Sequence, residues 1–324
     1  MNKQDLKIVF MGNPEFSVES LRRIHENGYN VVGVVTMPDR TGGRGNKRIE
    51  SAVKQYAESV GIPNIMQPEK LRDPDFIDRL RALDADLFIV IAFRMLPEVV
   101  WTMPRLGTFN LHASLLPKYR GAAPLNWAVI NGDSTTGVTT FFLKHEIDTG
   151  DIISRESIEI GPDENVGSVH DRLMTLGAKL TVNTIDRIIA GNLTTIPQDS
   201  LLADGTTPSP APKIFKETCH IDWNAPAQKI HNLVRGLSPY PGAWCTMTTD
   251  DGNTFDIKIY RTAMTGKTDN TRVAGSVNAA YGKMSVIAGD GKVLEIMEVQ
   301  APGKRRMDVA EYLRGCRWTE ASLS

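Results

Sequence analysis

Short, almost uninterrupted apolar runs alternate with amphipathic stretches through the first part of the chain. The runs that we expect to be strands cover residues 6–11, 29–35, 86–92, 108–113, 137–143 and 151–160. Such runs are typical of strands buried on both faces. Helical spacing is expected in residues 15–26, 49–60, 124–130 and 166–189, with a Gly- and Arg-rich loop at 38–48. The alternation predicts an α/β fold with a mainly parallel, doubly wound sheet.

The pattern changes after Gly191. Residues 192–212 are rich in Thr, Ser, Pro and Gly, which is typical of a linker. Beyond them we expect short strands at residues 243–248, 254–260, 273–277, 283–288 and 293–299. Short strands separated by glycine or charged turns predict a small barrel. The predicted organisation is therefore a domain of residues 1–191, a linker of residues 192–207 and a second domain of residues 208–324.

Composition and charge exclude several classes of protein. The 324 residues carry a formal net charge of −1, whereas sequence-blind coating of nucleic acid needs a strongly basic surface. Cys219, Cys245 and Cys316 lie far apart and form no CxxC pair, so we expect reduced thiols and no metal site. The amino-terminal residues lack a signal-peptide core, and no apolar run approaches the ~18 residues of a membrane span. We expect a cytoplasmic protein and, by default, a monomer.

The glycines argue against a nucleotide-cofactor dehydrogenase. Gly12, Asn13 and Pro14 follow the first expected strand, where a dinucleotide site would begin. The GxGxxG pattern is absent, however, and Pro14 lacks the N–H that a phosphate would need. The GGRG stretch at residues 42–45 does not fit a phosphate-binding loop, and the GxSxG pattern of serine hydrolases is also absent.

A polar group at a strand end is the stronger candidate site. Asn110 and His112 lie two apart on an expected strand, so their side chains share one face. Asp148 lies in an expected turn before Gly150. An amide can donate to a developing oxyanion, a histidine can transfer protons near neutral pH, and a carboxylate can orient the histidine. This set suits acyl transfer to an incoming amine, although each residue alone is also compatible with a purely structural role.

The spacing of this polar group resembles the folate-dependent formyltransferase family. The pattern N-x-H-x-SLLP-x-YRG begins at Asn110, and DTGD begins at Asp148. Further similar stretches include MGNPEFSVESL, PDRTGGRGNKR, GAAPLNWAVINGD and KIFKETCHIDWNAPAQKIHNLVRGLSPYPGAW. The resemblance implies a Rossmann-like formyltransferase domain, followed by a small β-barrel (OB-like) domain. It also implies 10-formyltetrahydrofolate as the formyl donor.

The resemblance implies roles for individual residues. Asn110 would bind the formyl oxygen, His112 would serve the tetrahedral intermediate, and Asp148 would hold His112 and assist proton removal. The folate-binding residues would be Ser114, Leu115, Leu116, Pro117, Ala92 and Phe93. Two positions depart from the family pattern, because Ala113 stands where glycine is usual and Arg94 where the family usually has glycine. The larger change, at Arg94, concerns the shape of the folate pocket.

The acceptor is implied by two further features, because the catalytic trio is common to relatives with different acceptors. The resemblance is greatest to the members that formylate initiator methionyl-tRNA. Cations that can meet phosphates lie in the 38–48 loop and near the end of the second domain: Arg40, Arg44, Lys47, Arg48, Lys304, Arg305 and Arg306. Small barrels often bind nucleic acid. An amino-sugar nucleotide formyltransferase, and a folate- or RNA-binding protein without catalysis, stay open as alternatives.

Overall fold

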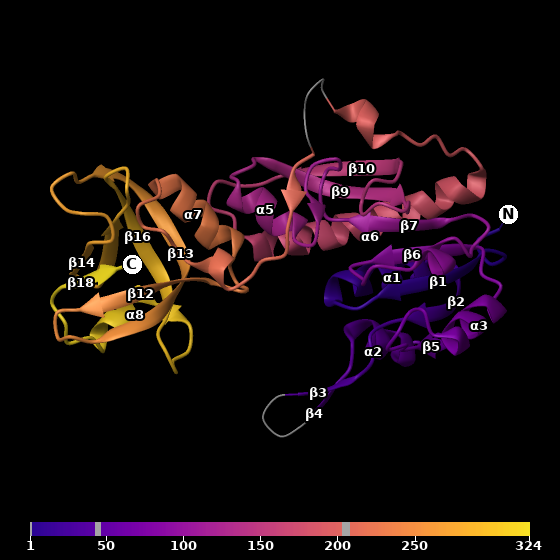
Figure 1. Ribbon diagram of the computed structural model, residues 1–324, viewed down its shortest axis with the longest axis horizontal. Coiled ribbons are helices and arrows are strands. Elements are labelled where there is room, and N and C mark those ends of the chain that lie inside the picture. The colour runs from indigo at the N-terminus through magenta and orange to yellow at the C-terminus, as the bar shows by residue number, and fades with distance from the viewer. Residues whose placement is uncertain (1, 43–46, 203–207) are drawn as a thin grey trace. The chain divides into compact units, whose positions relative to one another are not determined.

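The computed structural model describes residues 2–42, 47–202 and 208–324 (Figure 1). The chain divides into two compact units that do not simply follow chain order. The first unit comprises Met1–Pro124, Gly137–Ile158 and His170–Pro210, and the second comprises Leu125–Thr136, Glu159–Val169 and Ala211–Ser324. Both units therefore draw on segments that are far apart in the sequence.

A seven-stranded sheet is the centre of the first unit (Figure 1). Its strands, in spatial order, are β10 (Ile152–Glu159), β9 (Thr135–Phe142), β7 (Thr108–His112), β6 (Leu87–Ile91), β1 (Lys7–Gly12), β2 (Asn30–Val35) and β5 (Ile65–Met66). The strands from β7 to β5 pair in parallel, whereas β7 and β9 are antiparallel. The predicted mainly parallel α/β sheet is confirmed.

Five helices belong wholly or largely to the described part of this unit: α1 (Glu15–Glu26), α2 (Ala52–Ser59), α3 (Pro74–Ala82), α4 (Glu98–Trp101) and α6 (Val166–Ala190). Helix α1 begins close to the end of β1, because Gly12 has no Cβ; one built there would lie 2.7 Å from the Cβ of Ser17. The Ser17 hydroxyl donates to the Ile91 carbonyl at 2.7 Å. Residues 87–91 of β6 are all buried, as their unbroken apolar run predicts.

Two expectations for the first unit need correction. The expected loop at residues 38–48 contains a hairpin, formed by β3 (Arg40–Gly42) and β4 (Lys47–Ile49). The helix expected from residue 49 begins at Ala52 instead, because the Ser51 hydroxyl accepts a hydrogen bond from the Lys54 N–H and caps it. Helix α3 was not predicted, although Asp73 caps it and Pro74 occupies its first turn.

The second unit contains a nearly closed antiparallel barrel (Figure 1). The strand order is β14 (Val277–Ala280), β15 (Lys283–Ile287), β16 (Lys292–Gln300), β13 (Thr254–Thr268), β12 (Ala243–Thr249) and β18 (Ala321–Leu323), and β17 (Met307–Asp308) pairs with β16. An antiparallel bridge between Ser276 and Ser322 joins the two ends of this order. The predicted small barrel is confirmed.

Helices α5 (Pro124–Ile130), α7 (Ala227–Gly236) and α8 (Val309–Arg314) accompany the barrel. Helix α7 was not predicted, because buried polar residues, His231 and Arg235 among them, interrupt its apolar face. The strand expected at residues 273–277 is wrong. Residues 274 and 275 form a turn in which Gly275 adopts a φ of +83°, Ser276 makes an isolated bridge to Ser322, and strand β14 starts at Val277.

The short elements η1 (Gln198–Leu201), η2 (Glu217–Cys219), β8 (Arg120–Gly121) and β11 (Pro210–Ala211) complete the described structure. The segment expected to be a linker is thus partly ordered. Ile196 forms an antiparallel bridge with Ile152, and η1 follows it. In the described part of the chain, no helix is long and apolar enough to cross a membrane.

Candidate active site

Strand β7 carries two of the predicted catalytic residues near its carboxyl end. Asn110 is half-buried and lies between Val90 of β6 and Phe141 of β9 in the sheet. His112 is the last residue of the strand and is buried. Because the two residues are separated by one position, the strand directs both side chains to one face, as predicted.

His112 lies between a backbone carbonyl and a carboxylate. Its Nε2 is 2.8 Å from the Tyr119 carbonyl oxygen, which can only accept, so Nε2 carries a proton. Its Nδ1 is 3.8 Å from Oδ2 of Asp148, which exceeds hydrogen-bonding distance. In the neutral ring Nδ1 is an acceptor, so two acceptors face each other. A bound group that donates hydrogen bonds to both atoms would make the approach of Nδ1 and Oδ2 favourable, and so would a proton on Nδ1.

Asp148 is held in place by its backbone surroundings. The residue has a φ of +54°, which is uncommon for a residue other than glycine. Its Oδ2 accepts a hydrogen bond from the Gly121 N–H at 2.9 Å. Two residues later, a Cβ on Gly150 would lie 1.6 Å from the Phe142 carbonyl oxygen, so only glycine fits. The turn thus presents the Asp148 carboxylate to His112 in a fixed position.

Gln198 braces this turn and was not predicted. Its amide nitrogen donates to the carbonyls of Asp148 and Gly150, each at 2.8 Å. Its amide oxygen accepts from Nε and Nη2 of Arg120, at 3.0 and 2.8 Å. Gln198 lies 50 positions after Asp148 in a segment without periodic spacing, so no sequence pattern linked the two.

The loop after β7 contains four of the predicted folate-binding residues. The Ser114 hydroxyl donates to the Lys118 carbonyl at 2.6 Å, and Thr139 bonds both the Ser114 carbonyl and the Leu116 N–H. Ser114 and Leu116 are fully buried, Pro117 is buried and Leu115 is half-buried. Leu116 packs with Phe141 and Ile152. The structure brings these residues together in one rigid loop, and their role toward folate stays a prediction.

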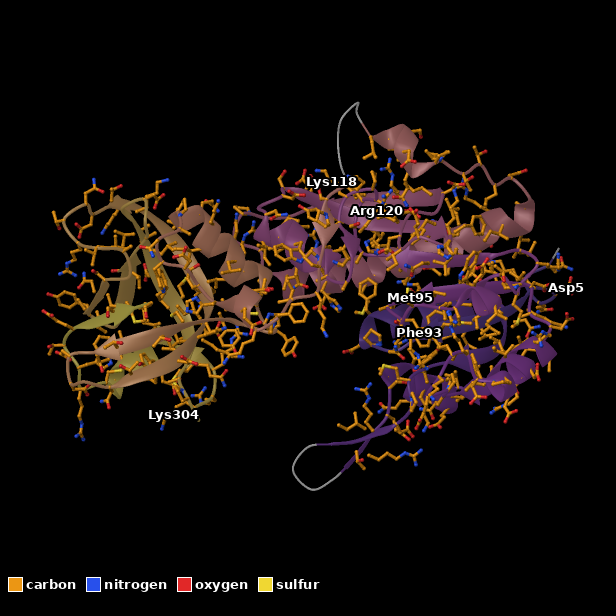
Figure 2. All side chains as sticks on the ribbon, viewed as in Figure 1. Asp5, Phe93, Met95, Lys118, Arg120 and Lys304 are labelled. Atoms are coloured by element: carbon orange, nitrogen blue, oxygen red, sulfur yellow. The ribbon has the colours of Figure 1, made fainter. Side chains whose placement is uncertain are left out.

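Residues 92–94 follow β6, the strand next to β7. Ala92 is exposed with a φ of +47°, and Phe93 is half-buried against the core of the unit. The Arg94 guanidinium donates to the carbonyls of Pro68 and Glu69, and it lies 5.6 Å from the Phe93 ring centroid. Burial lowers the pKa of Arg94. Figure 2 shows Phe93 beside Met95, which is 76% exposed.

The predicted tRNA-binding cations of the first unit differ in how they are engaged. Arg40 is exposed on β3 and has no ion pair within the described part of the chain. Arg44 lies outside the described residues, and Lys47 contributes its backbone to β4. Arg48 forms ion pairs with Asp39 and Glu50. Hydrogen bonds from Lys54, Gln67 and Arg48 hold the pKa of Asp39 well below its usual value.

The predicted cations of the second unit are also mostly paired. Arg306 makes a bidentate contact with Glu298, at 2.5 and 2.6 Å, and lies 4.4 Å from the Tyr260 ring centroid. Arg305 pairs with Glu311 at 2.5 Å. Lys304 is exposed (Figure 2). Within residues 2–42, 47–202 and 208–324, no three His, Cys, Asp or Glu side chains gather as metal ligands would.

Comparisons with known proteins identify the family. A family model described as formyl transferase matches residues 6–185, and one described as formyl transferase, C-terminal domain, matches residues 213–317. The methionyl-tRNA formyltransferase of Parabacteroides distasonis is 54% identical over 97% of this chain and 97% of its own. That of Bacteroides fragilis strain ATCC 25285 is 53% identical over 99% of this chain and 98% of its own.

Solved structures agree with this at the level of the fold. The crystal structure of an N-formyltransferase from Helicobacter canadensis covers 91% of this chain and 99% of its own, with a TM-score of 0.65 and 20% identity. The two family models together span both units, and the relatives match the chain over nearly its whole length. The chain therefore belongs to the formyl transferase family, among the methionyl-tRNA formyltransferases.

Proposed function

We propose that this protein transfers the formyl group of 10-formyltetrahydrofolate to the methionine amino group of initiator methionyl-tRNA. The proposal includes a cytoplasmic location and a monomer. Its main structural support is the His112–Asp148 pair, whose two acceptors face each other across 3.8 Å beside Asn110. An amine that attacks a carbonyl carbon carries N–H donors and must lose a proton, so it suits a position beside two hydrogen-bond acceptors. The names of the most similar relatives support the choice of acceptor.

The reaction needs no covalent bond to the enzyme. The amine nitrogen attacks the formyl carbon and forms the new C–N bond, and the bond from that carbon to the folate nitrogen then breaks. The Asn110 amide donates to the formyl oxygen as it becomes negative in the tetrahedral intermediate. Nδ1 of His112 takes the proton that the amine loses, and Asp148 stabilises the resulting imidazolium. The departing folate nitrogen receives a proton in return, so charge and protons balance.

The folate proposal depends on the chemistry of the surrounding residues. A pterin ring is flat, with two apolar faces and polar edges. The loop of Leu115 to Pro117 and the turn at Ala92 and Phe93 follow neighbouring strands, so both can approach such a ring near Asn110. Solved structures with this fold include complexes with folinic acid and with tetrahydrofolic acid. In our proposal Ser114 and Leu116, both buried, support the loop and leave ligand contact to its backbone and to Leu115.

Formylation assays with defined acceptors test this proposal. The protein is supplied with 10-formyltetrahydrofolate and either charged initiator tRNA or an amino-sugar nucleotide, because one solved relative with this fold is a sugar formyltransferase. We expect formyl transfer to methionyl-tRNA. Transfer to the sugar nucleotide alone would refute the proposed acceptor, and the absence of transfer to either would favour a binding protein without catalysis.

Substitution of Asn110 tests the proposed mechanism. Asn110→Ala should lower kcat by roughly 100-fold or more, because an oxyanion donor is lost while the strand persists. His112→Ala should lower it similarly through lost proton transfer. Asn278→Ala, at an exposed strand position of the barrel, is the matched control and should leave kcat unchanged. Single-turnover rates measure the effect, and wild-type rates for Asn110→Ala would contradict the assigned role.

A further inference from the structure

The β3–β4 hairpin (Figure 1) begins in a cluster of charged side chains that has no part in the proposed chemistry. Lys54 of α2 is the centre of this cluster, and only 5% of the residue is exposed. Its ammonium lies 2.7 Å from Oδ2 of Asp39 and 2.9 Å from Oε1 of Glu50. A lysine is rarely buried unless it is paired, so the two carboxylates fix where its ammonium lies.

The Asp39 carboxylate joins both strands of the hairpin to the rest of the first unit. Asp39 directly precedes β3, and Nε of Arg48, on β4, donates to its Oδ2 at 2.7 Å. The Lys54 ammonium donates to the same oxygen from α2. The amide of Gln67, just after β5, donates to Oδ1 at 2.7 Å and to the Met37 carbonyl at 2.7 Å. Three donors from three separate segments thus hold one carboxylate.

The residues that lead from β2 into the hairpin are fixed as well. The Met37 N–H donates to Oδ1 of Asn13, just after β1, at 2.8 Å. The buried Thr36 hydroxyl lies 2.6 Å from the Ser51 hydroxyl, which caps α2. Residues 36–39 are therefore bonded to segments at the ends of β1 and β5 and to the start of α2, and these bonds set the direction in which the hairpin leaves the sheet.

The hairpin leaves from the edge of the sheet that carries the candidate active site. Strands β2, β1, β6 and β7 pair in parallel, so their carboxyl ends lie at one edge. His112 ends β7, and residues 36–39 follow the end of β2. Arg40, the exposed first residue of β3, comes directly after Asp39. An acceptor whose amine reaches His112 therefore approaches the edge from which the hairpin leaves.

We propose that Asp39 and Lys54 are positioning residues for the acceptor: their pair fixes the hairpin so that Arg40 meets the tRNA while the amine lies at His112. Neither residue touches the tRNA in this proposal, and both act through the hairpin. The inference rests on the proposed function, since it concerns the same acceptor. It differs from a purely structural role, because loss of the pair impairs the use of tRNA and spares the use of folate.

Steady-state formylation by the full-length protein tests the positioning role. Lys54→Met and Asp39→Asn should each raise KM for methionyl-tRNA by roughly 10-fold or more, since small displacements of positioning groups cost up to about 100-fold. KM for 10-formyltetrahydrofolate should stay within about 2-fold of wild type. The double variant leaves neither partner buried without the other. Because both single changes break the same contact, its KM for tRNA should equal that of either single variant.

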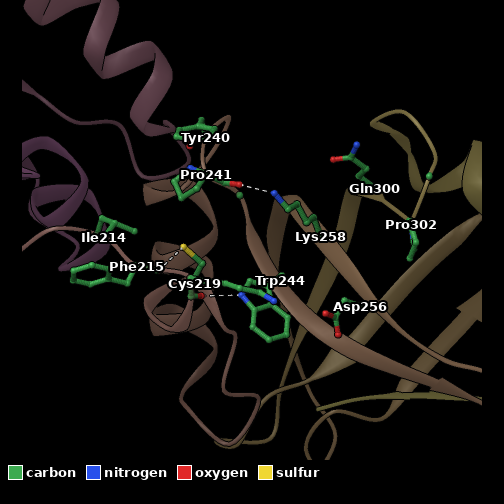
Figure 3. Close-up of a pocket in the computed structure, with 14 residues that line it drawn as sticks. Ile214, Phe215, Cys219, Tyr240, Pro241, Trp244, Asp256, Lys258, Gln300 and Pro302 are labelled. Carbon is green, nitrogen blue, oxygen red and sulfur yellow. Dashed lines mark hydrogen bonds between the residues drawn. The ribbon is translucent and has the colours of Figure 1, made fainter. Parts of the chain in front are cut away.

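Limited trypsin digestion, without tRNA or folate, measures the anchoring of the hairpin directly. Cleavage after Arg40 or Arg48, identified by mass spectrometry, should be at least ~5-fold faster in the three variants, because the hairpin opens more often. Lys258→Met is the control in the second unit, where Lys258 lines a groove and its ammonium donates to the Pro241 carbonyl at 2.9 Å (Figure 3). It should leave both cleavage rates unchanged.

Lys7→Met is the matched control for the kinetics, because the Lys7 ammonium pairs with Asp84 at 3.0 Å in the same unit. It should leave both KM values unchanged. A wild-type KM for tRNA in the double variant, an equal rise of KM for both substrates, or unchanged cleavage rates would each overturn the inference. A wild-type protein that formylates no tRNA would refute the proposed function instead, and the cleavage comparison would still test the anchor.

Discussion

The Gln198 side chain joins three places in the first unit that are far apart in sequence. It connects the guanidinium of Arg120 to the carbonyls of Asp148 and Gly150, and it is almost fully buried. Tyr119 and Gly121, the neighbours of Arg120, contact His112 and Asp148 themselves. Residues 119–121 therefore fix both members of the proposed catalytic pair, and Gln198 fixes residues 119–121 to the Asp148 turn. A buried amide with all these partners acts as a positioning residue.

Substitution of Gln198 should test whether its hydrogen bonds position the proposed catalytic residues. Gln198→Leu keeps the volume but leaves two carbonyls and a guanidinium without a partner, which costs ~1–3 kcal/mol for each buried group. Gln198→Glu keeps the acceptor for Arg120 but turns a carboxylate oxygen toward two carbonyls. We expect kcat for formylation to fall at least ~10-fold in both variants, while KM for tRNA changes little.

The control for Gln198 is Gln55→Leu, at an exposed position of α2. It should leave both kinetic constants and the melting temperature unchanged. If the Gln198 variants lowered only the melting temperature and kept the wild-type kcat, the amide would be a structural residue with no influence on the catalytic pair.

At the scale of elements, we expect the paired and unpaired cations of the β3–β4 hairpin to contribute differently to the salt dependence of tRNA binding. Arg48 is neutralised by Asp39 and Glu50, whereas Arg40 is exposed on the facing strand. If the hairpin meets tRNA phosphates, Arg40→Ala should reduce the salt slope of tRNA binding by about 1. Arg48→Ala should reduce it less, because its charge is already partly compensated. Nitrocellulose filter binding over a salt series measures both slopes, and equal slopes for wild type and Arg40→Ala would contradict the hairpin assignment.

The elements also show how far sequence patterns reach. Buried parallel strands such as β6 were predicted well, because burial on both faces produces an unbroken apolar run. Helix α7 was missed because His231 and Arg235 are buried with partners, which a hydropathy pattern reads as solvent-facing. The β3–β4 hairpin was missed because its strands are three residues each and largely exposed, so neither alternation nor a run could develop.

The candidate site divides in the same way. Asn110 and His112 follow from the two-residue period of a strand, which is a local property. The approach of Asp148 to His112 depends on a turn much later in the chain, and the sequence indicated it through the expected turn before Gly150 and through the family motif. Neither strand periodicity nor the motif indicated Gln198, because tertiary packing brings its hydrogen-bond partners to it. Local periodicity thus predicts which residues share a strand, and it does not predict what braces them.

At the scale of the whole molecule, each unit has its own hydrophobic core. In the second unit His231 is buried between the Thr262 hydroxyl, at 2.9 Å, and the Pro162 carbonyl, at 3.3 Å. Burial lowers the pKa of His231 below its usual value of 6.5, despite the opposing influence of Asp163. The unfolded state therefore binds this proton more readily than the folded state does. The unit keeps its full stability above that usual value and loses stability as pH falls below it.

Thermal unfolding should therefore show two transitions with different pH dependence. Between about pH 7.5 and about pH 5.5, the transition of the second unit should move to lower temperature. The depressed pKa of Asp39 in the first unit matters only below its usual value of 3.8, so that unit should respond less. Differential scanning calorimetry of wild type and His231→Gln provides the measurement. A single transition, or the same pH response in the variant, would contradict this account.

The bridge between Ile196 and Ile152, with Gln198 just beyond it, bears on how this enzyme can be divided. A truncation at Gly191, where α6 has ended, would retain every strand of the parallel sheet and all three proposed catalytic residues. It would also remove the amide that fastens the Asp148 turn and the strand pairing that anchors the edge of the sheet. Such a fragment would have the complete sheet of a catalytic domain and would still lack the contacts of Ile196 and Gln198 that hold the sheet edge and the Asp148 turn. Gene fusions and domain exchanges in this protein should therefore be joined after Pro210, the last residue of the first unit, so that the segment that carries Gln198 stays with the sheet.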